Sequence, residues 1–366
     1  MKYTEKIALP NDVFVLDSTV HAYNPSEENY VEGPYRERVA AQLSEVLWRG
    51  HSQLLPDGDP RWALSSERFK RPMDANTLSN ALFAESQTDI CIFHGTPLYG
   101  IYKDGGSPLE VGRQMRARSP GRVALYGPVS PWQPDALDVM DRLVEEYGVV
   151  GFKFYPMDIV DGRITSYRLD DPEIAFPLLE RARKLGIKNI ATHKAIPQGQ
   201  VPTGPFSPND VSGAAGAFPD LTFEIVHGGF AFLEETDWQL RCYPNVVVNL
   251  EGTSSYLMQG SPRRFAEIIG TFLRAGGEDR ILWATGCSSH HPRPYVDMFW
   301  NFQMPQDLVE GYGFPQLTEE IKRKILGLNH ARLLGWDVAA KRAAIADDEF
   351  GRLGAMREPW SAGANG

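Results

Sequence analysis

The sequence has no long hydrophobic run and no excess of positive charge. No segment approaches the roughly 20 apolar residues of a membrane-spanning helix, and the first residues, MKYTEKIALPND, lack the apolar core of a secretory signal peptide. The formal net charge is -10, whereas a nucleic-acid-binding surface is basic. We therefore expect a cytoplasmic protein that binds neither membranes nor nucleic acids.

Cysteine is scarce, and two common catalytic motifs are missing. The three cysteines, Cys91, Cys242 and Cys287, are an odd number spread over a long chain, which favours free thiols in a reducing compartment. No Gly-x-Ser-x-Gly stretch occurs, and this absence argues against a serine hydrolase with a nucleophile elbow. No glycine-rich phosphate-binding fingerprint follows an expected strand.

Short apolar runs rich in β-forming residues recur along the chain. Their nearly continuous apolar character is typical of parallel strands that are covered on both faces. The composition, with 42% hydrophobic and 23% charged residues, is that of an ordinary globular protein. We expect eight strands, at residues 13–21, 89–95, 122–129, 149–156, 188–194, 221–229, 245–252 and 280–286.

Helical patterns separate most of these runs, for example at 135–148, 170–186 and 317–336. Eight strands with interleaved helices predict an α/β fold, the (β/α)8 TIM barrel, and a doubly wound open sheet is the alternative. We expect one barrel domain over residues 1–340, including the closing helices. Residues 341–366 are expected to form a surface helix and a frayed tail.

Two long connections follow the first and the last expected strands, at residues 22–88 and 286–316. Both would begin at the C-terminal face of a barrel, where active sites lie. Their aromatic residues predict a wall for a bulky, apolar acyl or aryl group of a small-molecule substrate. The candidate substrate-binding residues are Tyr23, Tyr155 and Trp300, with Tyr30, Tyr35 and Phe302 as further members of these aromatic segments.

Four of the eight histidines lie at or beside the C-terminal ends of expected strands: His21, His94, His193 and His227. A single histidine at such a place is more often hydrogen-bonded than metal-binding. Four of them at one mouth of a barrel favour convergence on a metal ion. His51 and His330 lie in helical contexts and are assigned no chemistry.

The first strand, LDSTVHAYN, holds Asp17, Thr19 and His21 at every second position, so the alternation of a strand predicts that they share one face. His-x-His at this spacing is a common metal-binding design. Thr19 stands where the first histidine of such a pair would be.

These residues, with GFKFYP at 151–156, ATHK around His193, IVHGG around His227 and the closing KRKILGLNHARLLG, resemble the amidohydrolase superfamily over residues 13–336. The resemblance is to the branch of amidohydrolase-related metal-dependent hydrolases that also contains decarboxylases and lactonases. It implies one or two divalent metals held by a strand-one histidine pair, histidines of strands five and six, and a strand-eight aspartate that also serves as a base. Here Thr19 replaces the first histidine, and Gly286 stands in place of the aspartate.

The expected metal ligands are His21, His193 and His227, whose nitrogens suit zinc or iron. Glu251 ends the seventh expected strand, shares a face with Asn249, and is a further candidate ligand; a salt bridge or a helix cap is its alternative role. Lys153 is a candidate bridging ligand, carboxylated as in superfamily relatives, or else it binds a substrate carboxylate or an internal acid.

Candidates for the missing base follow the last expected strand. His290 or His291 could act as the base, or make a hydrogen bond at the rim. Cys287 could be a ligand or nucleophile, or a small buried thiol. His94 could orient the substrate or a metal-bound water.

The sequence therefore predicts a metal-dependent hydrolase that attacks an ester, thioester, amide or lactone. A bound metal lowers the pKa of water from about 16 to roughly 7, which supplies hydroxide at neutral pH. One alternative is a metal-dependent, non-oxidative decarboxylase of an aromatic or unsaturated acid; the missing strand-eight aspartate counts against it. Another is a degenerate barrel that binds a small molecule without turnover. The sequence leaves a homodimer open.

Overall fold

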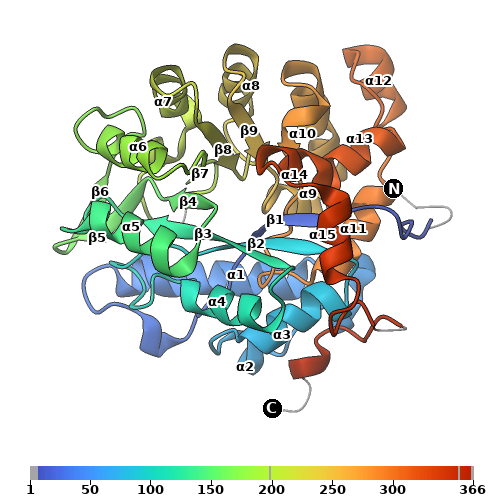
Figure 1. Cartoon of the computed structure of the whole chain (residues 1–366), viewed down its shortest axis with the longest axis horizontal. Helices are drawn as coiled ribbons and strands as arrows, with labels where there is room; N and C mark the ends of the chain where they lie inside the picture. The colour runs from blue at the N-terminus through green and yellow to red at the C-terminus, as the bar shows by residue number, and fades with distance from the viewer. Residues whose placement is uncertain (1–6, 198, 353–354, 364–366) are drawn as a thin grey trace.

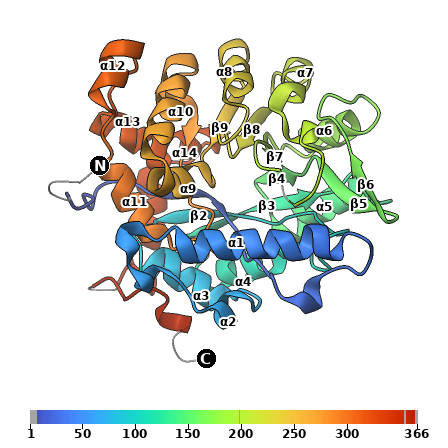
Figure 2. The same cartoon turned by 180° about the vertical axis from the view of Figure 1, so that it is seen from behind.

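A sheet of eight parallel strands lies at the centre of the protein. The structure is a computed structural model that describes residues 7–197, 199–352 and 355–363. The strands follow the order β1-β2-β3-β4-β7-β8-β9-β10, and helices surround them (Figures 1 and 2). Their bounds are β1 Leu16–Val20, β2 Ile90–His94, β3 Val123–Val129, β4 Gly151–Phe154, β7 Asn189–His193, β8 Thr222–Val226, β9 Val246–Asn249 and β10 Ile281–Leu282.

Backbone hydrogen bonds between β1 and the chain after β10 bring the two edges of the sheet together. Ser18 N donates to Trp283 O at 2.9 Å, Gly286 N donates to Thr19 O at 3.2 Å, and His21 N donates to Cys287 O at 2.6 Å. The sheet is thus a nearly closed (β/α)8 barrel, which confirms the TIM-barrel prediction. The alternative of an open, doubly wound sheet is wrong.

The helices lie between the strands in sequence and outside them in space (Figure 1). Helix α5 shows how local sequence sets their ends: it stops at Gly148, which takes the left-handed conformation with φ +55°. The helices are α1 Gln42–Gln53, α2 Ser66–Phe69, α3 Ala75–Ser79, α4 Leu109–Arg118, α5 Ala136–Tyr147, α6 Ala175–Lys184, α7 Val211–Ala217, α8 Leu233–Cys242, α9 Thr253–Gly260, α10 Pro262–Ala275, α11 Pro292–Asn301, α12 Gln306–Tyr312, α13 Glu319–Arg323, α14 Asn329–Leu333 and α15 Val338–Ile345.

A small hairpin after β4 was not predicted. Strands β5 Met157–Val160 and β6 Arg163–Ser166 pair in antiparallel fashion. The turn between them is Asp161-Gly162, and both residues have positive φ, +50° and +70°. Asp-Gly is a strong signal for such a turn, so the sequence did carry the information.

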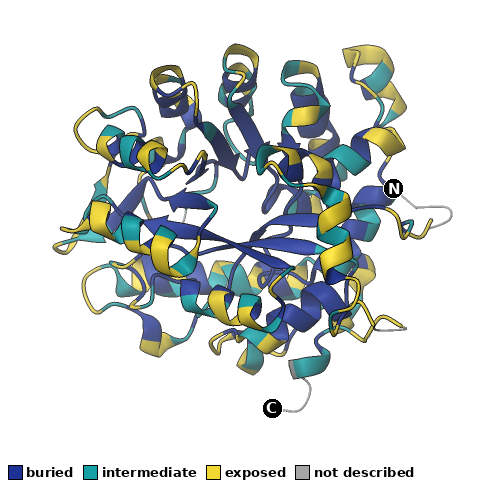
Figure 3. Ribbon diagram, viewed as in Figure 1, coloured by how far each residue is buried: buried dark blue, intermediate teal, exposed yellow. Residues whose placement is uncertain are grey.

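Two layers of apolar side chains hold the barrel together. Inside it, Leu16, Ile92, Tyr126, Ala191 and Val226 pack against one another from five different strands. Outside it, the alternate residues of the strands pack against the helices, and the strands are buried while the outer helix faces are exposed (Figure 3). None of the helices in the described part of the chain has the length and apolar character that crossing a membrane requires.

An irregularity in β1 corrects the predicted alternation of its residues. The pairing with β2 shifts between Asp17 and Val20. Ser18 and Thr19 both contact residues of the barrel interior, His330 and Asn249 respectively. Asp17 instead pairs in register with Cys91 and accepts hydrogen bonds from Thr285. Because this bulge inserts one residue, Asp17 does not share the face of Thr19 and His21.

The described part of the C-terminal tail packs against the body of the protein instead of fraying. Trp360 is 5% exposed. The Glu85 carboxylate accepts hydrogen bonds from Trp360 N at 2.6 Å and from Ser361 N at 2.9 Å. Residues 364–366 lie outside the described residues.

Candidate active site

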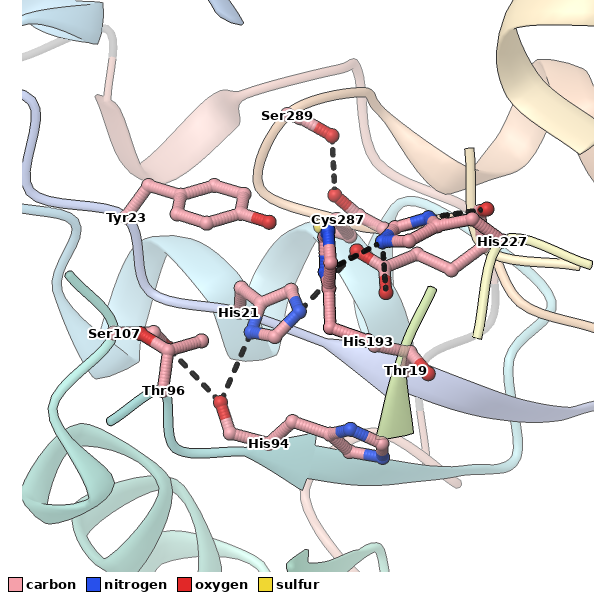
Figure 4. Close-up of polar contacts among 12 residues, drawn as sticks. Thr19, His21, Tyr23, His94, Thr96, Ser107, His193, His227, Cys287 and Ser289 are labelled. Atoms are coloured by element: carbon pink, nitrogen blue, oxygen red, sulfur yellow. Dashed lines mark hydrogen bonds and ion pairs between the residues drawn. The ribbon is translucent and has the colours of Figure 1, made fainter. Parts of the chain in front are cut away.

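Four side chains meet at the C-terminal ends of the strands: His21 after β1, His193 at the end of β7, His227 after β8 and Glu251 after β9. The three imidazole rings lie close together beside Tyr23 (Figure 4). All four side chains are buried, with at most 5% of each residue exposed. The structure thus brings together the three histidines and the glutamate that the sequence predicted as metal ligands, and we call them the mouth cluster.

Short distances link the members of the mouth cluster. His21 Nε2 lies 3.2 Å from Glu251 Oε1, and His227 Nε2 lies 3.8 Å from Glu251 Oε2. His227 Nε2 also lies 3.1 Å from His193 Nδ1. Glu251 is therefore the centre of the cluster, with imidazoles on two sides.

Backbone carbonyls fix how the three rings present their nitrogens. His21 Nδ1 lies 3.0 Å from His94 O, and His227 Nδ1 lies 2.8 Å from Glu251 O, so both Nδ1 atoms carry the hydrogen that a carbonyl accepts. His193 Nε2 donates in the same way to Ile196 O at 2.8 Å. In the neutral rings, the nitrogens left with lone pairs are therefore His21 Nε2, His227 Nε2 and His193 Nδ1.

Two of these lone pairs face each other, at His227 Nε2 and His193 Nδ1, and only a cation between or beside them relieves that contact. Burial and the charge of Lys153 disfavour a proton there: burial is the main cause that lowers the pKa of His193 well below its usual value and that of His227 to about 4. Two nitrogens bound to one metal ion, each at about 2.0–2.1 Å, lie roughly 3 to 3.5 Å apart.

The donor atoms suit a divalent metal, although the side chains are not arranged in a complete coordination geometry. His21 Nε2 and Glu251 Oε2 are buried and lack a hydrogen-bond partner. Among the residues that the structure describes, no group of three or more His, Cys, Asp or Glu side chains has the spacing of a metal site, because these side chains contact one another in pairs. Binding would require them to part slightly.

The neighbours of Gly286 and Thr19 show what these two residues contribute to the barrel. Gly286 has φ +69°, and a Cβ atom at this position would lie 3.1 Å from Glu251 Cγ. The absence of a side chain at 286 thus makes room for Glu251 at the end of the barrel. Thr19 Oγ1 accepts a hydrogen bond from Asn249 Nδ2 at 2.9 Å, so it ties β1 to β9 below the mouth cluster.

Glu251 of the mouth cluster and the nearby Lys153 are the two groups whose charge affects the site most. Burial opposes ionisation of Glu251, but His227, His21 and Lys153 together hold the pKa of this carboxyl well below its usual value. Burial lowers the pKa of Lys153 to about 8, against the opposing effect of Glu251 and Glu224. Among the described residues, Lys153 Nζ has no hydrogen-bond partner, and neither does either ring nitrogen of His94. Lys153 therefore forms no hydrogen bond with the predicted ligands, and its bridging role stays a prediction.

A narrow, mostly apolar pocket lies beside the mouth cluster. Tyr23 contacts His21, with ring centroids 4.9 Å apart, and Tyr155 stacks on His193 at 4.3 Å. Both tyrosines line the pocket, as the sequence predicted for substrate-binding residues. Sequence reasoning missed the other side of this pocket, formed by Leu43, Leu47, Thr96, Leu98 and Tyr102. The spacing of Leu43 and Leu47, one helical turn apart in the long connection, was the available signal.

The candidate bases after β10 lie in other surroundings. His291 Nε2 contacts Glu85 Oε2 at 3.1 Å, and its ring lies against Trp62 and Trp360. His290 packs against Tyr256 and Tyr295, with ring centroids 4.7 and 5.4 Å away. Neither histidine forms a hydrogen bond or ion pair with the mouth cluster in the described part of the chain, so the structure lends their predicted role as base no support.

Cys287 belongs to the apolar layer outside the strands. Burial, with the nearby Asp17 carboxyl, raises the pKa of its thiol well above the usual value, which disfavours the thiolate that a nucleophile or ligand needs. The structure therefore favours the buried-thiol alternative for Cys287.

The aromatic residues of the second long connection do not reach the pocket. The Trp300 ring lies beside Lys322 and Arg323, and Phe302 packs on Phe265. Their predicted place in the substrate wall is wrong because α11 turns them toward α10 and α13. In the first connection, Tyr30 packs on Tyr102, which lines the pocket, and Tyr35 lines a separate surface hollow.

Comparisons with known proteins agree with this fold. The sequence profile of the amidohydrolase family matches residues 103–336. No curated protein matches the sequence. An uncharacterized TIM-barrel protein from Bordetella bronchiseptica is similar in structure, with a TM-score of 0.60 and 18% identity over 88% of this chain and 98% of that chain.

Two further solved structures carry functional names. A dihydroxybenzoic acid decarboxylase from a Polaromonas species, with bound manganese and an inhibitor, matches with a TM-score of 0.53 and 14% identity over 89% of this chain and 97% of that chain. A probable 2-pyrone-4,6-dicarboxylic acid hydrolase from Acinetobacter baumannii, with citric acid bound, matches with a TM-score of 0.53 and 10% identity over 88% of this chain and 99% of that chain. At such low identities these likenesses show the fold alone.

Proposed function

The chain belongs to the amidohydrolase family, and from that premise we propose that it is a metal-dependent hydrolase of a small ester, thioester, amide or lactone with an apolar acyl or aryl part. The observation that carries the proposal is the pair of facing lone pairs at His227 Nε2 and His193 Nδ1, 3.1 Å apart, beside the ionised Glu251. A divalent cation satisfies all three groups at once.

The proposed ligands are His21 Nε2, His193 Nδ1, His227 Nε2 and Glu251 Oε1. Three imidazoles suit zinc or iron, and carboxylate also suits manganese, the metal in the Polaromonas structure. The carbonyls of His94 and Glu251 hold His21 and His227 by their Nδ1 atoms and keep the Nε2 lone pairs directed into the cluster. When bound, the metal supplies a Lewis acid for the carbonyl and lowers the pKa of water.

Glu251 also replaces the strand-eight aspartate as the base in this proposal. Its Oε2 atom has no hydrogen-bond partner among the described residues, and the neighbouring His227, His21 and Lys153 hold the pKa of the carboxyl well below its usual value. Oε2 therefore accepts the proton that the attacking water releases. Tyr23 and Tyr155 hold the apolar part of the substrate in the adjoining pocket and exclude bulk water from one side.

A second candidate function is decarboxylation of an aromatic acid. The structural likeness to the decarboxylase favours it, as does the unpartnered ammonium of Lys153, which suits a carboxylate. The two reactions differ in their products, since only decarboxylation releases carbon dioxide.

The test is metal removal followed by reconstitution. Protein stripped with a chelator and then loaded with zinc, iron or manganese is assayed against aryl esters, thioesters and lactones, and against hydroxybenzoates with detection of carbon dioxide. We expect hydrolysis only after metal loading. Carbon dioxide release without hydrolysis would favour the second candidate. No turnover on either panel with any metal would contradict both and leave a barrel that only binds small molecules.

A further inference from the structure

Lys153 and His94 have polar atoms that nothing in the described structure satisfies. Lys153 is on β4 and His94 ends β2, and both are completely buried. Lys153 Nζ and both ring nitrogens of His94 lack hydrogen-bond partners. A buried ammonium without a partner is unfavourable by several kcal/mol, so such a group commonly has a task.

The strands connect these two residues directly to the pocket. Tyr155 follows Lys153 by two positions and Thr96 follows His94 by two, and both Tyr155 and Thr96 line the pocket. Lys153 Nζ lies 5.4 Å from the centre of the Tyr155 ring. His94 stacks on Tyr126 of the intervening strand β3, with ring centroids 4.6 Å apart. The Lys153 ammonium is thus close to one of the side chains that line the pocket.

The two carboxylates that act on Lys153, Glu224 and Glu251, lie against other groups. Glu224 Oε1 accepts a hydrogen bond from Tyr126 at 2.5 Å, and Glu224 Oε2 accepts one from Asn249 at 3.3 Å. Glu251 lies against His21 and His227. Both carboxylates act on Lys153 through space, but neither forms a hydrogen bond or ion pair with its Nζ atom in the described structure.

We propose that Lys153 and His94 form a carboxylate-binding subsite, so that the substrate carries an ionised carboxylate in addition to the carbonyl group that reacts. This inference rests on the proposed function for the identity of the reacting group, although not for the subsite itself. Lys153 donates charge-assisted hydrogen bonds to the carboxylate, and the protonated nitrogen of neutral His94 donates one more. Such bonds contribute about 1.5–3 kcal/mol each, which is roughly a 10- to 150-fold change in affinity.

The experiment measures binding without turnover. Benzoate and its neutral analogue benzamide are titrated calorimetrically into metal-free protein, for the wild type, Lys153→Met and Lys322→Met. Lys322 is the matched control because it is also a buried lysine, but its Nζ donates to Trp300 O at 2.6 Å, away from the pocket. We expect the wild type and Lys322→Met to prefer benzoate at least tenfold. Lys153→Met should lose that preference while its affinity for benzamide changes less than twofold.

Three outcomes would overturn the subsite: an unchanged preference in Lys153→Met, no preference in the wild type, or no binding of benzoate to the wild type. A thermal melt shows whether Lys153→Met is folded, and we expect it to melt no lower than the wild type because the substitution removes a buried charge. A failure of the proposed function can be distinguished from a failure of the carboxylate-binding subsite. A barrel without metal-dependent hydrolysis can still show the Lys153-dependent preference for benzoate, and an active hydrolase can lack it.

Discussion

Two buried clusters of histidine and glutamate lie near the C-terminal face of the barrel, and they differ in how completely they are hydrogen-bonded. The first is the mouth cluster. The second, which we call the tail anchor, consists of His51, Glu85, His291, Trp360 and Ser361. In the tail anchor, Glu85 Oε1 accepts from Ser361 N and Oγ at 2.9 and 2.6 Å, while Oε2 accepts from Trp360 N and contacts His291 Nε2.

Both ring nitrogens of His51 in the tail anchor are also hydrogen-bonded. Its Nδ1 donates to Ser289 O at 2.9 Å, and its Nε2 accepts from Leu64 N at 2.7 Å. In the mouth cluster, by contrast, His21 Nε2 and Glu251 Oε2 have no hydrogen-bond partner among the described residues and lie only in ion-pair contacts with their neighbours. Buried polar groups are nearly always bonded when their task is structural. The comparison therefore separates a structural cluster from a functional one, although both are made of the same residue types.

The largest expected effect is on catalysis at the mouth cluster. Glu251→Gln keeps the shape of the side chain but removes its charge and its basicity. We expect the rate of hydrolysis to fall at least about 1,000-fold, or roughly 4 kcal/mol in the barrier. The fold should be as stable as in the wild type, because an incompletely bonded buried charge is removed. Steady-state kinetics and urea unfolding measure the two effects, and a fall of less than tenfold in rate would remove Glu251 from the mechanism.

The opposite pattern is expected at the tail anchor. Glu85→Gln places an amide NH2 against donors that now face a carboxylate, so the free energy of unfolding should fall by about 3 kcal/mol. The rate per folded molecule should stay within about twofold of the wild type. Urea unfolding and an active-site titration check this prediction. A large loss of rate with unchanged stability would show that the tail anchor takes part in catalysis, and it would contradict the distinction between the two clusters.

Acid should weaken the tail anchor through His51. Burial lowers the pKa of His51 to about 4, so the unfolded chain binds more protons between pH 6.5 and pH 4. The contribution to stability is complete above pH 6.5 and is lost as the pH falls to 4, by about 3 kcal/mol at most. Urea unfolding of the wild type and of His51→Gln across this range should show a shallower slope in the variant. If the free energies of unfolding of the two proteins changed equally with pH, His51 would not be the group that weakens the tail anchor in acid.

The smallest effect is expected at Cys287. Cys287→Ala removes one buried sulfur from the apolar layer, and we expect a loss of about 1 kcal/mol in stability and a rate within about twofold of the wild type. If the substitution abolished turnover in folded protein, Cys287 would have to be returned to the catalytic candidates. Thermal melts and steady-state kinetics measure both quantities.

The strand pattern and the position of four histidines could be predicted from the sequence because parallel strands are apolar throughout and their carboxyl ends share one face. The bulge at Asp17 could not be predicted, since it depends on the pairing of β1 with β2. The contact between Glu251 and Gly286 could not be predicted either. It depends on how the chain turns after β9 and after β10, where Gly286 has φ +69°.

The residues after β10 show the limit of reasoning from position alone. His290 and His291 also follow a strand of the barrel, but they come eight and nine residues after the end of β10, whereas His227 directly follows β8. The first two are packed against aromatic rings and Glu85. Their direction is decided by helix α11, for which His291 is the N-cap. Position after a strand predicts nearness to the mouth, whereas the unsatisfied atoms that identify the site appear only in the folded structure.

The metal site at the mouth cluster is tested most directly by the metal content of the purified protein after reconstitution, measured by elemental analysis for the wild type, His193→Ala and the tail-anchor control His291→Gln. We expect at least one equivalent of a divalent transition metal in the wild type and in His291→Gln, and a loss of metal in His193→Ala. A wild type that retains no metal, or equal metal in all three proteins, would contradict it.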